Sequence, residues 1–261
     1  MTLNRRSTSY FWSLMGFLFS LLIGLCVGGL INVLADDLPL RRRPQLPHCR
    51  DTGERLPPHL WLGLTRRLLT RGRCPHCGDP DGWRPVVVEI ATAATFGLLW
   101  ALHGALSAQL AVTAVYFAVF ILIFVTDMEH RLILHIVTLP SIAFALLVSP
   151  FTVTPISALL GAVVGFAVFF AIYLLGSWLF GSGAMGFGDV TLATLIGAAV
   201  GLPVVIVALL SGILTGGLVT LFLLVTRLRR LRSKVPYGPF LLTGAAIGLL
   251  WGSQIVAWYL S

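Results

Sequence analysis

The feature that most constrains this chain is its succession of long apolar stretches. A membrane-spanning helix needs roughly 20 predominantly apolar residues, and eight stretches approach that length: 11–34, 86–106, 109–126, 136–150, 156–180, 189–202, 203–226 and 238–260. Only 11% of the residues are charged and the mean hydropathy is +0.93, whereas about 25% of the residues of a soluble domain are charged. The sequence therefore predicts an all-α polytopic membrane protein with about eight transmembrane helices.

One polar region interrupts this pattern. Residues 36–85 are rich in Arg and Pro and contain three of the four cysteines. We therefore expect three parts: a first transmembrane helix at 1–35, a Cys- and Arg-rich loop at 36–85 and a membrane core at 86–261. The first apolar stretch is long and lacks an Ala-x-Ala-like cleavage site, which favours a retained helix over a removed signal peptide.

The distribution of positive charge predicts the orientation. Of the 18 Lys and Arg residues, ten lie in 36–85 and five in 227–234, whereas the connections near 103–110, 149–155 and 201–203 carry none. Because basic loops remain on the cytoplasmic side, we expect residues 36–85 and 227–234 on the cytoplasmic side and both termini on the opposite side of the membrane. The net charge of +8 then reflects topology and contact with membrane lipids, and we expect no nucleic-acid partner.

Two aspartates at segment ends are the main evidence of function. Asp127 ends the apolar stretch 109–126, and Asp189 opens the stretch 189–202. An acidic residue at membrane depth costs free energy unless it faces a watery cavity or a partner. The predicted alternation of helices across the membrane brings Asp127 and Asp189 to the same membrane face. Two neighbouring carboxyl groups that share one proton can perform aspartic proteolysis. Asp127 and Asp189 are therefore the predicted catalytic residues.

Other readings of the same residues stay open. Asp189 could be a helix N-cap, and Asp127 could be an interfacial charge answered by Arg131. A proton- or cation-coupled transporter or channel could use the two aspartates as a relay, which would predict an inverted repeat; the sequence shows no convincing one. A methyltransferase or scaffold without proteolysis is the remaining rival.

Three further residues are candidates for substrate binding. Gly186 and Gly188 precede Asp189 and would let a substrate strand approach the backbone closely. Glu89, at the start of the stretch 86–106, could position substrate or pair with an arginine of the loop.

The loop also contains a candidate metal site. Cys74-Pro-His-Cys77 has the spacing of one half of a zinc ribbon, and Leu46-Pro-His-Cys49 resembles a second half in which Leu46 replaces a thiol. We expect zinc to be held by Cys49, Cys74 and Cys77 with His48, His59 or His76 as fourth ligand. The alternative is a solvated basic loop with reduced cysteines and no metal.

The motifs together resemble the type 4 prepilin peptidases, bacterial membrane aspartic proteases that process prepilins and the pseudopilins of type II secretion. The resemblance rests on these segments, in order: Gly-Gly-Leu-Ile-Asn-Val (28–33), Arg-Gly-Arg-Cys (71–74) with Cys77, Arg-Pro-Val-Val-Val-Glu (84–89), Asp127 through Pro140, Gly-Phe-Gly-Asp (186–189) and Pro-Tyr-Gly-Pro-Phe (236–240). It implies a bacterial inner-membrane location, an active site facing the cytoplasm and leader cleavage by Asp127 and Asp189 without a cofactor. It also implies methylation of the new N-terminus from S-adenosylmethionine.

The chain departs from the family pattern at three places. The usual Pro-Asn or Pro-Asp after the first catalytic aspartate is Leu134-His135, and the usual Lys two residues after the second is Thr191. Neither change removes a carboxyl group, so we still expect cleavage. The loss of one loop cysteine bears on methylation, which the family associates with that loop.

Overall fold

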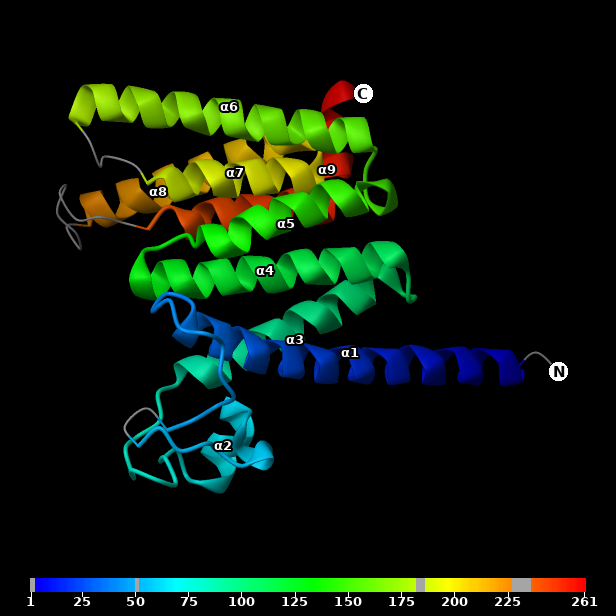
Figure 1. Ribbon diagram of the computed structural model, residues 1–261. Helices are drawn as coiled ribbons and strands as arrows, with labels where there is room; N and C mark the ends of the chain where they lie inside the picture. Colours follow the sequence, from blue (N-terminus) through cyan, green and yellow to red (C-terminus); the bar gives the residue numbers. More distant parts are fainter. Residues whose placement is uncertain (1–2, 50–51, 182–185, 227–235) are drawn as a thin grey trace. The chain divides into compact units, whose positions relative to one another are not determined.

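The computed structural model describes residues 3–49, 52–181, 186–226 and 236–261 (Figure 1). Its regular elements are helices: α1 (Leu3–Asp37), η1 (Pro58–Leu60), α2 (Gly63–Leu69), α3 (Arg84–His103), α4 (Ala108–His130), α5 (His135–Val148), η2 (Ser149–Phe151), α6 (Pro155–Phe180), α7 (Phe187–Val200), α8 (Val204–Val225) and α9 (Gly238–Leu260). The described residues form no β-strand, and the predicted all-α class is confirmed.

Each of the eight predicted apolar stretches overlaps with one of these helices. Six helices (α1, α3, α4, α6, α8 and α9) are long and apolar enough to cross a membrane. The other two, α5 and α7, have 14 residues each, which gives a length of about 21 Å against a hydrocarbon core of about 30 Å. The protein is a polytopic membrane protein with six long apolar helices and two short ones among its described residues.

The chain divides into two compact units, and the boundary between Val125 and Thr126 falls inside α4. The predicted limits at residues 35 and 85 instead follow helix ends, because α1 ends at Asp37 and α3 begins at Arg84. As a division into domains these limits stay a prediction.

In the first unit, α1 packs along α3 at glycine positions. A Cβ atom at Gly24 would lie 2.6 Å from the Cα atom of Ala93, and one at Gly28 would lie 2.6 Å from the Cα atom of Glu89. Even a single added Cβ atom would therefore force α1 and α3 apart, so Gly24 and Gly28 determine how closely the two helices approach.

In the second unit, α7 is the central helix. Its residues from Val190 to Val200 are buried, apart from the half-buried Thr194, and it contacts α5, α6, α8 and α9. Gly161 and Gly165 of α6 face Ala193 and Gly197 of α7 so closely that an added Cβ would collide with the facing carbonyl groups. Small residues therefore let α6 and α7 pack backbone to backbone. This close packing fixes the position of α7, including its first turn, relative to α6.

Candidate active site

The last two turns of α4 carry Asp127 into the second unit. Its side chain is 5% exposed, and its Oδ2 atom is buried without a hydrogen bond among the described residues. The backbone N–H of Gly238, the first residue of α9, faces the same carboxyl group. A Cβ atom at residue 238 would lie 2.5 Å from Oδ2 of Asp127, so only glycine leaves this carboxyl group its space.

Asp189 comes to this place from the first turn of α7. The helix starts at Phe187 after the extended N-cap Gly186, so Asp189 is not itself the N-cap. A carboxylate in the first turn is favoured by the helix dipole. Asp189 is close enough to Asp127 for their charges to interact, whereas the described residues show no ion pair between Asp127 and Arg131. The structure thus brings the two aspartates together from separate helices.

A tyrosine lies beside this pair. Tyr237 precedes α9, and its ring lies near Phe169 and Phe240, at centroid distances of 6.4 and 6.3 Å. Burial and the neighbouring Asp189 carboxylate raise the pKa of Tyr237 above its ordinary value. The phenol therefore stays protonated at neutral pH and can donate a hydrogen bond next to the carboxyl groups.

The two glycines before Asp189 have different surroundings. A Cβ atom at Gly188 would lie 2.7 Å from Cβ of Ile133, so this glycine admits the segment that leads into α5. At Gly186 the nearest atoms would lie 4.0 Å away, so the N-cap position has room for a side chain. Gly188 thus has a packing role, and substrate binding by either glycine stays a prediction.

The two positions that depart from the family pattern meet in space. Oγ1 of Thr191 lies 3.5 Å from Nδ1 of His135 and donates to the carbonyl of Gly188 at 2.9 Å. Thr138 of α5 lies on the other side, with its hydroxyl 3.5 Å from that of Thr191. A polar contact between α5 and α7 therefore lies two residues beyond Asp189 along α7.

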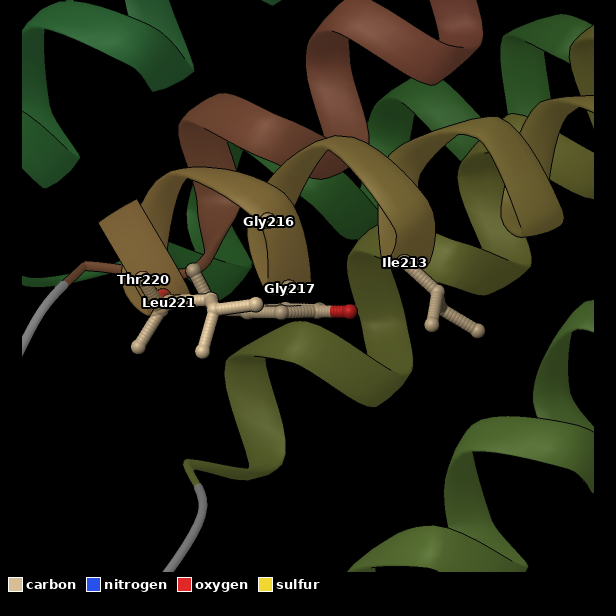
Figure 2. Close-up of a pocket in the computed structure, with 6 residues that line it drawn as sticks. Ile213, Gly216, Gly217, Thr220 and Leu221 are labelled. Carbon is tan, nitrogen blue, oxygen red and sulfur yellow. The ribbon is translucent and has the colours of Figure 1, made fainter. Parts of the chain in front are cut away.

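An open cavity of ≈ 440 Å³ adjoins Tyr237. Figure 2 shows its wall along α8, which is made by Ile213, Gly216, Gly217, Thr220 and Leu221. A Cβ atom at Gly216 would lie 3.0 Å from the Tyr237 ring, whereas one at Gly217 would meet nothing within 4 Å. The cavity is largely apolar and reaches the aromatic ring that neighbours Asp189.

Glu89 belongs to the first unit, where it is fully buried. Its carboxylate accepts hydrogen bonds from the backbone N–H groups of Gly63 (2.6 Å) and Leu64 (2.8 Å) in the first turn of α2, and Asn32 approaches it at 3.4 Å. These bonds satisfy N–H groups that a helix start leaves without intrahelical partners. Glu89 therefore anchors the polar loop on α3, and its predicted contact with substrate stays a prediction.

The three loop cysteines also meet in the first unit. The sulfur atoms of Cys49, Cys74 and Cys77 lie within 4.8 Å of one another, a separation that one zinc ion with Zn–S bonds of about 2.3 Å can span. His48 is not part of this cluster, because its Nδ1 atom faces the carbonyl of Leu46 at 3.1 Å. His76 lies 2.6 Å from Glu54 and is outside the cluster as well.

Sequence reasoning did not assign Tyr237 or Gly238 to the site. Both belong to the segment 236–240 noted for its resemblance, and that motif was the available signal. Their proximity to Asp189 and Asp127 depends on how α9 packs on α4 and α7, which no local pattern states.

Comparison with known proteins gives the same picture over most of the chain. Residues 114–221 match the type IV leader peptidase family, and residues 22–103 match the bacterial peptidase A24 N-terminal domain. The chain is 31% identical to a prepilin leader peptidase/N-methyltransferase of Aeromonas hydrophila, over 82% of this chain and 73% of that protein. It is 27% identical to the protein of that name from Pseudomonas aeruginosa, over 93% of each, and 28% identical to that from Bacillus subtilis, over 92% and 96%. No solved structure matches it.

Proposed function

This chain belongs to the type IV leader peptidase family, and from that premise we propose that it is a membrane aspartic endopeptidase. Its substrates are type IV prepilins or the pseudopilins of type II secretion, from which it removes the leader peptide. The observation that carries the assignment is the meeting of Asp127 and Asp189, brought from α4 and α7 beside the backbone of Gly238.

The pair performs general acid–base catalysis. One carboxylate takes a proton from water as the water oxygen attacks the scissile carbonyl carbon, while the protonated partner donates to the carbonyl oxygen. The aspartate that took the water proton then donates it to the amide nitrogen and the C–N bond breaks. As the carbonyl re-forms, a hydroxyl of the tetrahedral intermediate returns its proton to the other aspartate, so the pair again holds one proton. The Asp189 carboxylate influences the ionisation of Tyr237, and this supports a role for the protonated phenol in stabilising developing charge.

The apolar cavity beside Tyr237 supports the choice of substrate. A prepilin-like substrate presents an apolar helix that begins just after the cleavage site. The cavity lined by α8 offers that segment an apolar surface next to the ring that neighbours Asp189. The substrate thus packs beside the enzyme with its scissile bond at the carboxyl groups.

Orientation, cofactors and the second activity complete the proposal. The basic residues of 36–85 favour a cytoplasmic active site in a bacterial inner membrane. Proteolysis needs no cofactor, and the three loop thiols fit zinc. The relatives' names include N-methyltransferase, and we assign methylation of the new N-terminus, with S-adenosylmethionine as donor, to this chain as well.

The decisive experiment is cleavage of a purified prepilin in detergent, with N-terminal sequencing of the product. D127N and D189N keep the shape of each side chain and remove its titratable group, so each is expected to lower turnover by a factor on the order of 10³ or more. E129Q, two residues from Asp127 on the same helix, is the matched control and should retain cleavage.

Near wild-type turnover of either aspartate variant would refute the proposed mechanism. A transporter using the same aspartates would show no product at all from the wild-type protein, and neither the family match nor the relatives' names support that alternative. Adding S-adenosylmethionine and measuring the mass of the product by mass spectrometry tests methylation separately, since each transfer adds one methyl group.

A further inference from the structure

The two cysteine segments of the loop fold into the same turn. We refer to the described residues 47–49 and 52–56 as the first cysteine turn and to residues 72–81 as the second. In the first, the N–H of Cys49 donates to the carbonyl of Glu54 at 2.8 Å, and that of Gly53 donates back to Cys49 at 2.9 Å. In the second, Cys74 bonds to Asp79 at 2.8 Å and Gly78 bonds back to Cys74 at 2.9 Å.

The flanking contacts repeat as well, at the same interval of 25 residues that separates Cys49 from Cys74. The corresponding features are the bridges His48–Arg55 and Arg73–Pro80, the bonds Leu56 to Pro47 and Asp81 to Gly72, and positive φ at Gly53 (72°) and Gly78 (77°). The geometry therefore fixes the correspondence between the turns without reference to which residues are cysteines.

This correspondence relocates the absent thiol. Cys74 matches Cys49, so Cys77 matches Thr52, while Leu46 matches Arg71. The interpretation of Leu46 as a replaced ligand is wrong, because residue 46 lies before the turn that carries the ligands. Oγ1 of Thr52 accepts from the N–H of Glu54 at 3.4 Å, so the threonine side chain is held inside this turn.

We propose that Cys49, Cys74 and Cys77 bind zinc through three thiolates and that the fourth position of the metal lies at Thr52, where it stays open to a small exogenous donor. Zinc prefers four ligands in a tetrahedron, and a site with three protein ligands keeps one position for solvent or another small ligand. Cys49 is buried and Thr52 is exposed, so the closed part of the site faces the protein and the open position faces solvent.

The loop histidines lie outside the sulfur cluster. His76 lies between the two cysteines of the second turn, and its Nδ1 atom contacts Glu54 at 2.6 Å. This pair joins the two turns side by side. Within the part of the chain that the structure describes, the sulfur cluster is the only group of three or more metal-ligating side chains.

Cobalt substitution in full-length protein tests the proposal without reference to peptidase activity. Wild-type, T52C and L46C proteins are purified in detergent with a phosphine reductant, stripped of metal and loaded with Co²⁺. Thiolate-to-cobalt charge-transfer absorption grows with the number of thiolates, so T52C should exceed wild type by about one third. L46C adds the same thiol at a position outside the turn and should match wild type.

Three additions define the open position. T52V removes the hydroxyl, and its spectrum should equal that of wild type. A small alkyl thiol should raise the absorption of cobalt-loaded wild type and leave T52C unchanged. In the zinc-loaded proteins, removal of the metal from T52C should require about ten times as much chelator as removal from wild type, or more. T52H, which supplies an imidazole at the same place, should also hold zinc more tightly than wild type.

Several results would overturn the inference. They are absence of the charge-transfer band in cobalt-loaded wild type, a gain in L46C in place of T52C, a spectral change in T52V, or loss of the band in H48A or H76A. Helicity by circular dichroism and a single gel-filtration peak establish that each variant is folded. Because every readout is spectroscopic or a metal count, failure here is distinct from failure of prepilin cleavage.

Discussion

Nδ1 of His135 lies 3.5 Å from Oγ1 of Thr191, so the two positions at which this chain departs from its family's pattern are neighbours across α5 and α7. A lysine at the buried position 191 would need a charged partner that a neutral histidine does not supply. T191K alone places an ammonium group in a site that is 7% exposed and should destabilise the protein.

The prediction is a coupling between these positions. The double variant H135D/T191K pairs a carboxylate with the ammonium group and should recover stability and cleavage lost in T191K, with a coupling energy of about 1 kcal/mol or more. Thermal unfolding and kcat/KM of all four proteins measure it. Additive effects would show that the contact has no energetic weight.

Gly238 is predicted to be intolerant of any side chain. Its added Cβ would lie 2.5 Å from Oδ2 of Asp127, so G238A must displace the carboxyl group or the start of α9. Overpacking of this kind costs about 1–3 kcal/mol, and we expect turnover to fall by about tenfold or more. G82A is the control, since nothing lies within 4 Å of that position and it does not line the cavity. Full activity of G238A would contradict the described fit between α9 and Asp127.

The hydroxyl of Tyr237 is predicted to contribute to turnover. Y237F keeps the ring that lies near Phe169 and Phe240 and removes one donor beside Asp189, for which we expect a decrease in kcat of about 10- to 100-fold.

The pH profile distinguishes this role from simple packing. Since burial and the Asp189 carboxylate raise the pKa of Tyr237, its phenol remains protonated and the deficit of Y237F should be constant between about pH 6 and 9. It should shrink only at higher pH, where the wild-type phenol ionises. An unchanged kcat with a lowered melting temperature would identify Tyr237 as a packing residue.

The cavity along α8 is predicted to receive substrate. G217L adds a side chain at a cavity-lining position where an added Cβ meets nothing within 4 Å, so helix packing should survive while KM for a prepilin rises by about tenfold. V219L enlarges an exposed side chain of the same helix that does not line the cavity and should have no effect. Equal KM values for both variants would remove the cavity from the substrate path.

Glu89 is predicted to act on the loop. In E89Q both N–H groups of α2 lose a charged acceptor: one keeps a neutral carbonyl oxygen and the other faces an NH2 donor, at a cost of about 1–3 kcal/mol. Limited proteolysis should then cut residues 38–83 faster, with KM for prepilin unchanged. A raised KM without faster proteolysis would instead support the substrate-binding role expected from the sequence.

The predictability of the fold follows from what each signal encodes. The apolar stretches predicted the helices because length and hydropathy are local properties, and Asp127 and Asp189 were found because carboxylates are rare at membrane depth. Tyr237 and Gly238 were missed, since their role depends on the start of α9 meeting α4 and α7. The sequence assigned the missing fourth thiol to Leu46, because Leu-Pro-His-Cys resembles Cys-Pro-His-Cys. The hydrogen bonds that define the turn, which a sequence does not display, assign it to Thr52.

The bonds between Glu89 and α2 also set an order of assembly. Synthesis proceeds from the N-terminus, so Gly63 and Leu64 are made before Glu89 has been added to the chain. Until α3 emerges, the first turn of α2 has no carboxylate to hold it, and all three loop cysteines have already been made. The loop therefore gains its anchor on α3 only after its own residues have been made, and a released chain truncated before residue 89 should expose its thiols to alkylation.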